Sequence, residues 1–151
     1  MSIIDLLNRW FRREEINGAN RCPTYLFRWT LIYCRWFGIY VHRFVGDDWS
    51  LDLHDHPKRF ISIGLRGQYV EETPAGEQTF CSPWFRSFPA EHKHRLRLID
   101  GKECWTLVVV LRAVRPWGFW HLGSFIPWKQ YVTEIGGAAD MMKSCPDEES
   151  T

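Results

Sequence analysis

The sequence lacks any stretch close to the roughly 20 consecutive apolar residues that a membrane-spanning helix requires. It also lacks the pattern of a secretory signal peptide, because Asp5, Asn8 and Arg9 interrupt the apolar residues near its start. No internal period long enough for a repeat protein is present. We therefore expect a cytoplasmic protein without a membrane span and without a solenoid architecture.

Closely spaced cysteines and a strong net charge are also missing. The five cysteines are widely separated and form no C-x-x-C pair, which argues against a cysteine-based zinc site and a thioredoxin-like motif. Free thiols in a reducing compartment are the expectation. The formal net charge is only +1, so no global positive field would attract nucleic acid. Nucleic acid is therefore not an expected partner.

Apolar and aromatic residues are abundant. Of the 151 residues, 45% are hydrophobic and 16% are aromatic, and nine are Trp. A chain of this length can bury one sizeable core, so a single domain is the simplest organisation. Large aromatic side chains pack well between strands, so the composition favours a β-rich fold.

The first residues predict an amphipathic helix over residues 2–15. Ser2 can cap its N-terminus, and Asp5 suits the positive end of the helix dipole. An apolar stripe at helical spacing comprises Ile3, Leu6, Leu7, Trp10 and Phe11. Such a helix could lie on a membrane surface, but packing against its own domain is the commoner outcome and the one we expect.

The rest of the chain predicts many short strands separated by turns. No helical periodicity persists there, and turn residues such as Asp100-Gly101 recur along it. Expected strands are 25–33, 38–45, 51–56, 59–65, 68–72, 78–81, 84–88, 92–98, 103–112 and 117–121, followed by a strand or helical turn at 125–132. This pattern indicates an all-β sandwich or barrel. We divide the chain into a helix and linker at 1–20, a barrel at 21–135 and a disordered tail at 136–151.

The histidines suggest a metal site. His54 and His56 are two residues apart, which places both imidazoles on the same face of a strand. A second H-x-H follows at His92 and His94. Neutral imidazoles are common ligands of transition metals, so a third histidine from a second strand could complete a mononuclear site.

Residues 38–121 resemble the cupin superfamily, whose fold is a jelly-roll barrel or double-stranded β-helix. His54-Asp55-His56 followed by Gly67 is similar to the first cupin motif, and the run from Pro89 to His94 is similar to the second. The H-D-H-P and P-W-G-F-W runs also resemble small bacterial and phage cupin-like proteins without an established reaction. The resemblance implies an all-β cupin barrel, here preceded by an N-terminal helix, and identifies His94 as the third ligand.

The sequence departs from the cupin motifs at three positions. Phe60 occupies the place of the motif glutamate, Glu91 that of a glycine, and Leu98 that of an asparagine. The usual 2-His-1-carboxylate set is therefore incomplete, and the three-His face that remains resembles the thiol dioxygenase branch of cupins. The implied cofactor is one divalent transition metal, which is iron or, alternatively, zinc, nickel or manganese.

Other polar residues are further site candidates. Asp52 shares strand parity with the histidine pair, so it could be a fourth ligand or orient an imidazole, whereas Asp55 points away if the strand is regular. Glu91 could act as a base or ligand, or simply be exposed in a loop. His92 is a spare histidine, and His42 could face the same cavity or bond across the sheet.

These observations predict a small cupin with a metal at His54, His56 and His94, acting as an iron-dependent, oxygenase-type oxidoreductase on a small polar molecule. Two alternatives stay open. One is a non-catalytic module that binds a small molecule or a partner. The other is a metal-free sugar-nucleotide isomerase or epimerase with a histidine as general base and arginines holding the phosphates. We also expect a homodimer, because the early strands are long enough to need covering.

Overall fold

The computed structural model describes residues 1–18 and 23–135, so the expected disorder of 136–151 lies outside the described residues. The elements are α1 (Ile3–Trp10), β1 (Arg12–Asn17), β2 (Thr24–Tyr33), β3 (Gly38–Phe44), β4 (Leu53–His54), β5 (Lys58–Arg66), β6 (Gln68–Thr73), β7 (Gly76–Cys81), β8 (Phe85–Phe88), β9 (Arg95–Leu98), β10 (Cys104–Ala113), β11 (Gly118–His121), β12 (Ser124–Pro127), α2 (Trp128–Gln130) and a π-helical turn (Tyr131–Ile135). None of the helices within these ranges is long and apolar enough to cross a membrane.

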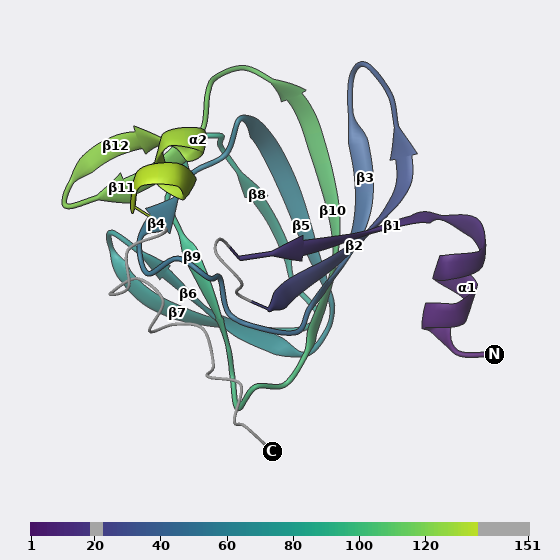
Figure 1. Cartoon of the computed structure of the whole chain (residues 1–151). Coiled ribbons are helices and arrows are strands. Elements are labelled where there is room, and N and C mark those ends of the chain that lie inside the picture. Colours follow the sequence, from purple (N-terminus) through teal and green to yellow (C-terminus); the bar gives the residue numbers. More distant parts are fainter. Residues whose placement is uncertain (19–22, 136–151) are drawn as a thin grey trace.

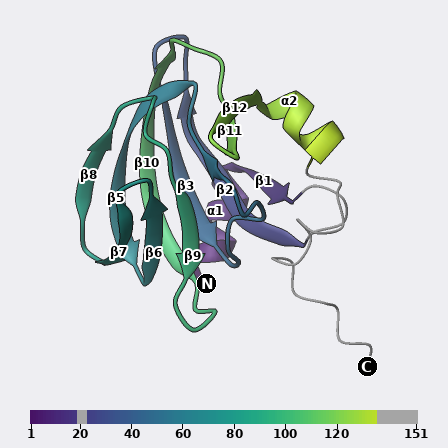
Figure 2. The same cartoon turned by 90° about the vertical axis from the view of Figure 1, so that its left-hand side faces the viewer.

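The strands form antiparallel sheets arranged as two facing walls (Figures 1 and 2), and a cavity lies between them. One sheet has six strands in the order β1-β2-β3-β10-β5-β8. The other wall consists of two three-stranded sheets, β7-β6-β9 and β12-β11-β4. An antiparallel bridge between His54 and His94 joins these two smaller sheets. The all-β, two-walled architecture expected from the strand pattern is therefore confirmed.

Alternation along the strands sends side chains to two different environments. In β10, Cys104, Thr106 and Val108 are buried, and Thr106 and Val108 line the cavity. The intervening Trp105 points to the opposite face of the six-stranded sheet, where it packs with Trp29. Because side chains alternate between faces with a period of two, a single strand supplies both the cavity wall and an outer core.

Helix α1 covers the outer face of the six-stranded sheet. Leu7 packs against Trp29, Val41 and Trp105, and the rings of Trp29 and Trp105 are stacked with centroids 5.7 Å apart. Ser2 and Asp5 form a capping box at the start of the helix, which satisfies two of its otherwise unpaired backbone N–H groups. The helix therefore packs on its own domain, as expected.

The predicted extent of this helix is wrong. The helix ends at Trp10, and residues 12–17 form strand β1, which pairs with β2 at the edge of the six-stranded sheet. The apolar periodicity stops at Phe11, and the residues that follow are mainly charged. Arg13 lies over the ring of Phe27 at 5.3 Å and ion-pairs with Glu15. The open edge of β2 thus outweighs the weak helical tendency of this segment.

Most other strand predictions are confirmed, with shorter ends near the site. Strand β4 covers only Leu53–His54 of the expected 51–56, and β9 begins at Arg95 instead of residue 92. Asp100 and Gly101 both have positive φ, 54° and 63°, as a tight turn requires. The segment expected to be a strand or a helical turn contains both, since β12 runs directly into α2.

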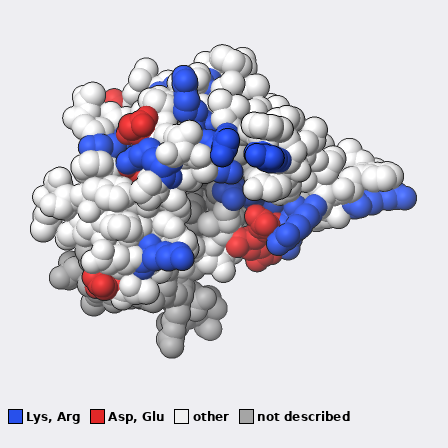
Figure 3. All heavy atoms as spheres, turned by 90° about the horizontal axis from the view of Figure 1, so that it is seen from above, with Lys and Arg blue, Asp and Glu red and all other residues white. Residues whose placement is uncertain are grey.

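Charge is unevenly distributed over the surface despite the small net charge. Basic side chains are spread more widely than acidic ones over the face seen from above (Figure 3). Arg35, Lys58, Arg59 and Arg112 form no ion pair with the residues at 1–18 and 23–135. A small anion approaching this face would therefore meet a favourable potential.

Candidate metal centre

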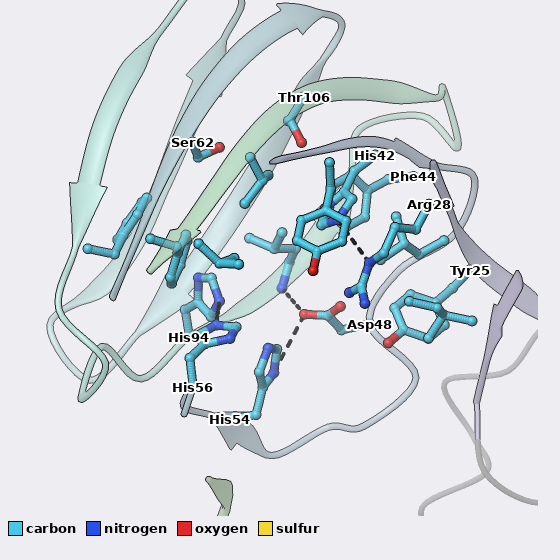
Figure 4. Close-up of a pocket in the computed structure, with 18 of the residues that line it drawn as sticks. Tyr25, Arg28, His42, Phe44, Asp48, His54, His56, Ser62, His94 and Thr106 are labelled. Atoms are coloured by element: carbon cyan, nitrogen blue, oxygen red, sulfur yellow. Dashed lines mark hydrogen bonds and ion pairs between the residues drawn. The ribbon is translucent and has the colours of Figure 1, made fainter. Parts of the chain in front are cut away.

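Three histidines meet where the two smaller sheets join (Figure 4). The backbones of His54 and His94 exchange two hydrogen bonds of 2.9 Å across the bridge, and the His56 N–H donates to the Ala90 carbonyl at 3.0 Å. Short backbone contacts thus fix all three residues. Their ring centroids are 5.0–5.1 Å apart, and one ligand atom from each lies within 4.8 Å of the others.

The surroundings of His54 and His56 favour their neutral imidazoles in the folded protein. Burial lowers the pKa of His54 to about 4, although Asp48 partly opposes the shift. Burial, followed by the neighbouring histidines, lowers the pKa of His56 well below its usual value. A neutral imidazole offers a lone pair, so the environment favours the form that binds a metal.

The spacing of the nitrogens fits a shared ion. Nε2 of His56 and Nε2 of His94 are 2.8 Å apart. Two nitrogens that each bind one ion at about 2.1 Å, at an angle near 90°, lie about 3 Å from each other. Without an ion, one of the two nitrogens must carry a proton to make this contact favourable. The donor set and its spacing therefore suit a mononuclear transition-metal site.

Glu71 on β6 is a functional candidate that the sequence reasoning missed. Its carboxylate is 1% exposed and accepts hydrogen bonds from His94 Nδ1 at 2.7 Å, His92 Nε2 at 2.9 Å and Arg86 at 2.7 Å. The bond to Nδ1 fixes the His94 tautomer and leaves its Nε2 free to act as a ligand. Tyr69, two residues earlier on the same strand, is also buried. The alternation of side chains along the strand could therefore have predicted that Glu71 points inward.

The charge of Glu71 is stabilised despite its burial. Burial alone would raise the pKa of its carboxyl group, but hydrogen bonds from His92, His94 and Arg86 hold the pKa below its ordinary value. Glu71, His92 and His94 also lie close enough to hold a metal ion. Their N···O distances are those of hydrogen bonds, and Arg86 already neutralises the carboxylate. We therefore interpret Glu71 and His92 as residues that hold His94 in position, not as ligands of a second metal ion.

Phe60, at the sequence position of the motif glutamate, lies beside the histidines. Its ring lies 4.6 Å from that of His56 and is stacked on Phe88 at 4.7 Å. The substitution makes the wall beside the histidines apolar. The carboxylate of Glu71 contacts His94 from the outer side and does not replace the missing group at the cavity.

The two aspartates near the histidine pair bond elsewhere. Asp55 is fully buried and points away from the cavity, as strand parity predicted. Asp52 accepts hydrogen bonds of 2.7 Å from His121 and from Tyr131. Strand β4 begins only at Leu53, so parity does not extend to Asp52. The imidazole that Asp52 orients is that of His121.

The remaining candidates are divided between the site and the surface. Glu91 is exposed, and His92 contacts the site through Glu71 and through the ring of His94, 5.0 Å from its own. His42 lines the cavity and also bonds across the sheet, accepting a 3.1 Å hydrogen bond from Arg28 Nε. Burial raises the pKa of the Cys104 thiol to about 12, so this cysteine is an inert core residue.

Asp48 was also missed from the sequence. It is 8% exposed, and its Oδ2 accepts the Leu96 N–H at 2.7 Å and lies 3.8 Å from His54 Nδ1. It follows β3 in what reads as a loop of polar residues. Only the pairing of this loop with β9 brings the carboxylate to the cavity.

The histidines open onto a cavity of about 460 Å³ between the sheets. This volume is typical of sites for small metabolites. Most of its wall is apolar, including Leu26, Phe44, Phe60, Phe88, Val108 and Phe119. A small molecule with an apolar body would fit beside the three imidazoles.

Comparisons with known proteins identify the fold. No protein-family model and no curated protein matches the chain. The polyketide cyclase RemF from Streptomyces resistomycificus is 16% identical, with a TM-score of 0.61 over 87% of this chain and 92% of that one. A predicted oxalate decarboxylase from Thermotoga maritima is 13% identical, with a TM-score of 0.55 over 68% and 93%.

A third similar structure is a sugar phosphate isomerase of the cupin superfamily from Silicibacter pomeroyi. It is 16% identical, with a TM-score of 0.54 over 74% of this chain and 78% of that one. At such identities the likeness concerns the fold. The chain has the expected cupin-type double-stranded β-helix with an N-terminal helix.

Proposed function

From this fold we propose that the protein is a metal-dependent enzyme, of the oxygenase type, that acts on a small molecule in the cavity. The observation that carries the proposal is the convergence of His54, His56 and His94 at the cavity wall, with one ligand atom from each within 4.8 Å of the others. A divalent transition metal held there would supply a Lewis acid and, if it is iron, redox chemistry.

The chain's own residues would prepare the site for such chemistry. Glu71 fixes the orientation of His94, and Asp48 lies beside His54. Phe60 and Phe119 form apolar walls that exclude water around the imidazoles. A dry and rigid surrounding strengthens electrostatic interactions with a bound molecule, because little solvent reorganisation is then required.

Metal analysis tests this proposal. Protein purified after growth with iron and zinc is expected to contain about one ion per chain, and the triple variant H54A/H56A/H94A less than about a tenth of that. H121Q serves as the matched control, because His121 lies outside the group. Circular dichroism confirms that the variants are folded. Equal metal contents in wild type and triple variant would overturn the site assignment.

Oxygen consumption then separates an enzyme from a binding module. With Fe(II) and a panel of thiols and small carboxylic acids, the wild type is expected to consume oxygen and the triple variant is not. Ligand binding without any consumption would favour the non-catalytic module. The isomerase alternative has less support, because Arg95 and Arg97 are engaged by Glu72 and so are not free to hold phosphates.

Replacing Glu71 with Gln is expected to weaken metal binding about 10- to 100-fold, the usual cost of losing a group that orients a ligand. The amide cannot accept hydrogen bonds on both of its polar atoms, so His94 loses its fixed tautomer. E72Q is the matched control, since Glu72 follows on the same strand and pairs outside the cavity with Arg95 and Arg97. Competition with a chromophoric chelator measures both affinities, and equal affinities would contradict this role.

A further inference from the structure

A row of polar side chains crosses the cavity face of the six-stranded sheet. The strand register places Arg28 opposite His42, and His42 opposite Thr106. We call these three residues the polar strip. One neighbouring row is Leu26, Phe44 and Cys104, which is apolar. The strip is therefore a local exception on a wall that is otherwise mostly apolar, and all three residues line the cavity.

Arg28 is held in a defined orientation and forms no ion pair with a described carboxylate, since Glu14, opposite it in the strand register, pairs with Arg12. The Arg28 Nε donates to His42 Nε2 at 3.1 Å (Figure 4), and its guanidinium lies over the Tyr40 ring at 5.2 Å. Burial, and then the nearby Arg28 charge, lowers the pKa of His42 well below its usual value, so the imidazole stays a neutral acceptor. Within the described ranges, the terminal nitrogens of Arg28 form no ion pair and no hydrogen bond. They present a planar fork suited to a carboxylate.

Thr106 supplies a second unsatisfied polar group. The residue is 2% exposed, and its hydroxyl has no hydrogen-bond partner among the residues at 1–18 and 23–135. Figure 4 shows this hydroxyl on the cavity side of β10. Buried hydroxyl groups are nearly always paired, because an unpaired one costs about 1–3 kcal/mol. A polar atom of a bound ligand would satisfy it.

The charges around the cavity favour an anion. Arg28 and Lys58 line it as cations, and Asp48 is the one carboxylate among the described lining residues. Asp48 is already engaged by the Leu96 N–H, and no described carboxylate pairs with Arg28 or Lys58. Two cationic side chains against one carboxylate make the balance of charge among these lining residues positive. A metal at the three-His group would increase it further.

We infer that the cavity binds a small monocarboxylate with an apolar body, its carboxylate on Arg28 and a second polar atom on Thr106. The apolar body would then lie along Phe44, Val108 and Phe60 and extend toward the three imidazoles. The inference names the substrate class of the proposed enzyme. It rests on the proposed function in one respect, namely that the reacting end of the ligand lies at the three imidazoles. The carboxylate site itself requires no metal, so the two proposals can fail separately.

Benzoate and its neutral analogue benzamide are suitable probes, tested by calorimetry on protein freed of metal with a chelator. We expect the wild type to prefer benzoate by about 10-fold or more, since a charge-assisted bidentate pair is roughly twice as strong as a neutral hydrogen bond. R28M is expected to lose this preference. R35M is the matched control, because Arg35 is equally unpaired but lies outside the cavity.

The triple variant H54A/H56A/H94A distinguishes this inference from the proposed function. Retained benzoate preference in that variant, together with its loss in R28M, supports the strip even if the wild type binds no metal. The proposed carboxylate site is overturned if R28M keeps the benzoate preference while the triple variant loses it, or if the wild type shows no preference. If R28M does not fold, NMR of the wild type replaces it. The Arg28 Nε–H resonance is then assigned as the one that is missing from the spectrum of R28K. Benzoate is expected to shift that resonance and not that of Arg35, and an unchanged Arg28 resonance overturns the inference.

Discussion

Replacing Asp55 with Ala is expected to lower the free energy of unfolding by about 3–5 kcal/mol, the usual cost of removing one partner of a buried ion pair. The Asp55 carboxylate is 0% exposed and accepts from Arg115 at 2.7 Å, the Gly118 N–H at 3.0 Å and Trp120 Nε1 at 3.2 Å. Its removal leaves the Gly118 N–H and Trp120 Nε1 without this acceptor and leaves Arg115 with the Ala90 carbonyl at 3.4 Å. The same residue separates His54 from His56, so metal binding should weaken as well.

Urea unfolding followed by Trp fluorescence measures the effect of D55A. For a chain of this length, the loss corresponds to a melting temperature lower by about 10 °C or more. E91A is the matched control, because Glu91 is an exposed carboxylate in the segment that His56 pairs with, and its loss should change stability by less than about 0.5 kcal/mol. A D55A variant as stable as E91A would contradict the structural role of the Asp55 network.

The fold could be predicted because its signals are local. Turn residues such as Asp100-Gly101 and short β-prone apolar runs along β5 and β10 identify strands without knowledge of their partners. Strand β1 was missed for the converse reason. Its residues are largely polar, and it becomes a strand only because the edge of β2 accepts it. No local pattern in residues 12–17 carries that information.

The site was predictable only in part, for a similar reason. The H-x-H spacing placed His54 and His56 on one face, and motif resemblance supplied His94. Glu71 and Asp48 come from segments without any metal-ligand spacing. They reach the histidines because β6 pairs with β9 and because the loop after β3 pairs with Leu96. Such long-range pairings determine which polar groups surround a site, and spacing in the sequence does not reveal them.

The polar strip was harder still to predict from the sequence. Arg28, His42 and Thr106 come from three strands whose register aligns them in one row. Each residue alone reads as an ordinary strand residue, and His42 was a candidate for the site only by its type. Once the register is known, Glu14 is seen opposite Arg28 but ion-paired with Arg12, and the lack of a described ion pair to Arg28 is what favours a binding group over a structural one.

Mild acid is expected to destabilise the metal-free protein. Burial lowers the pKa of His54 to about 4 in the folded state, whereas in the unfolded chain a histidine titrates near 6.5. Below pH 6.5 the unfolded chain therefore binds a proton that the folded protein does not. Stability is fully present above that pH and is lost progressively as the pH falls toward 4.

The size of this loss in stability follows from the shift in the pKa of His54. His54 alone should lower the free energy of unfolding by about 2 kcal/mol between pH 7 and pH 5 and by about 3 kcal/mol at full effect. His42 and His56 act in the same direction, because burial also lowers their pKa values. Together they could remove a large share of the 5–15 kcal/mol that usually stabilises a domain.

Urea titrations at several pH values, in the presence of a chelator, measure this dependence. H54Q should show a shallower slope than the wild type, because the amide does not titrate. A wild-type unfolding midpoint that is the same at pH 7 and pH 5 would contradict the neutral state of the buried histidines. Adding zinc should steepen the dependence, since protons then compete with the metal for the same nitrogens.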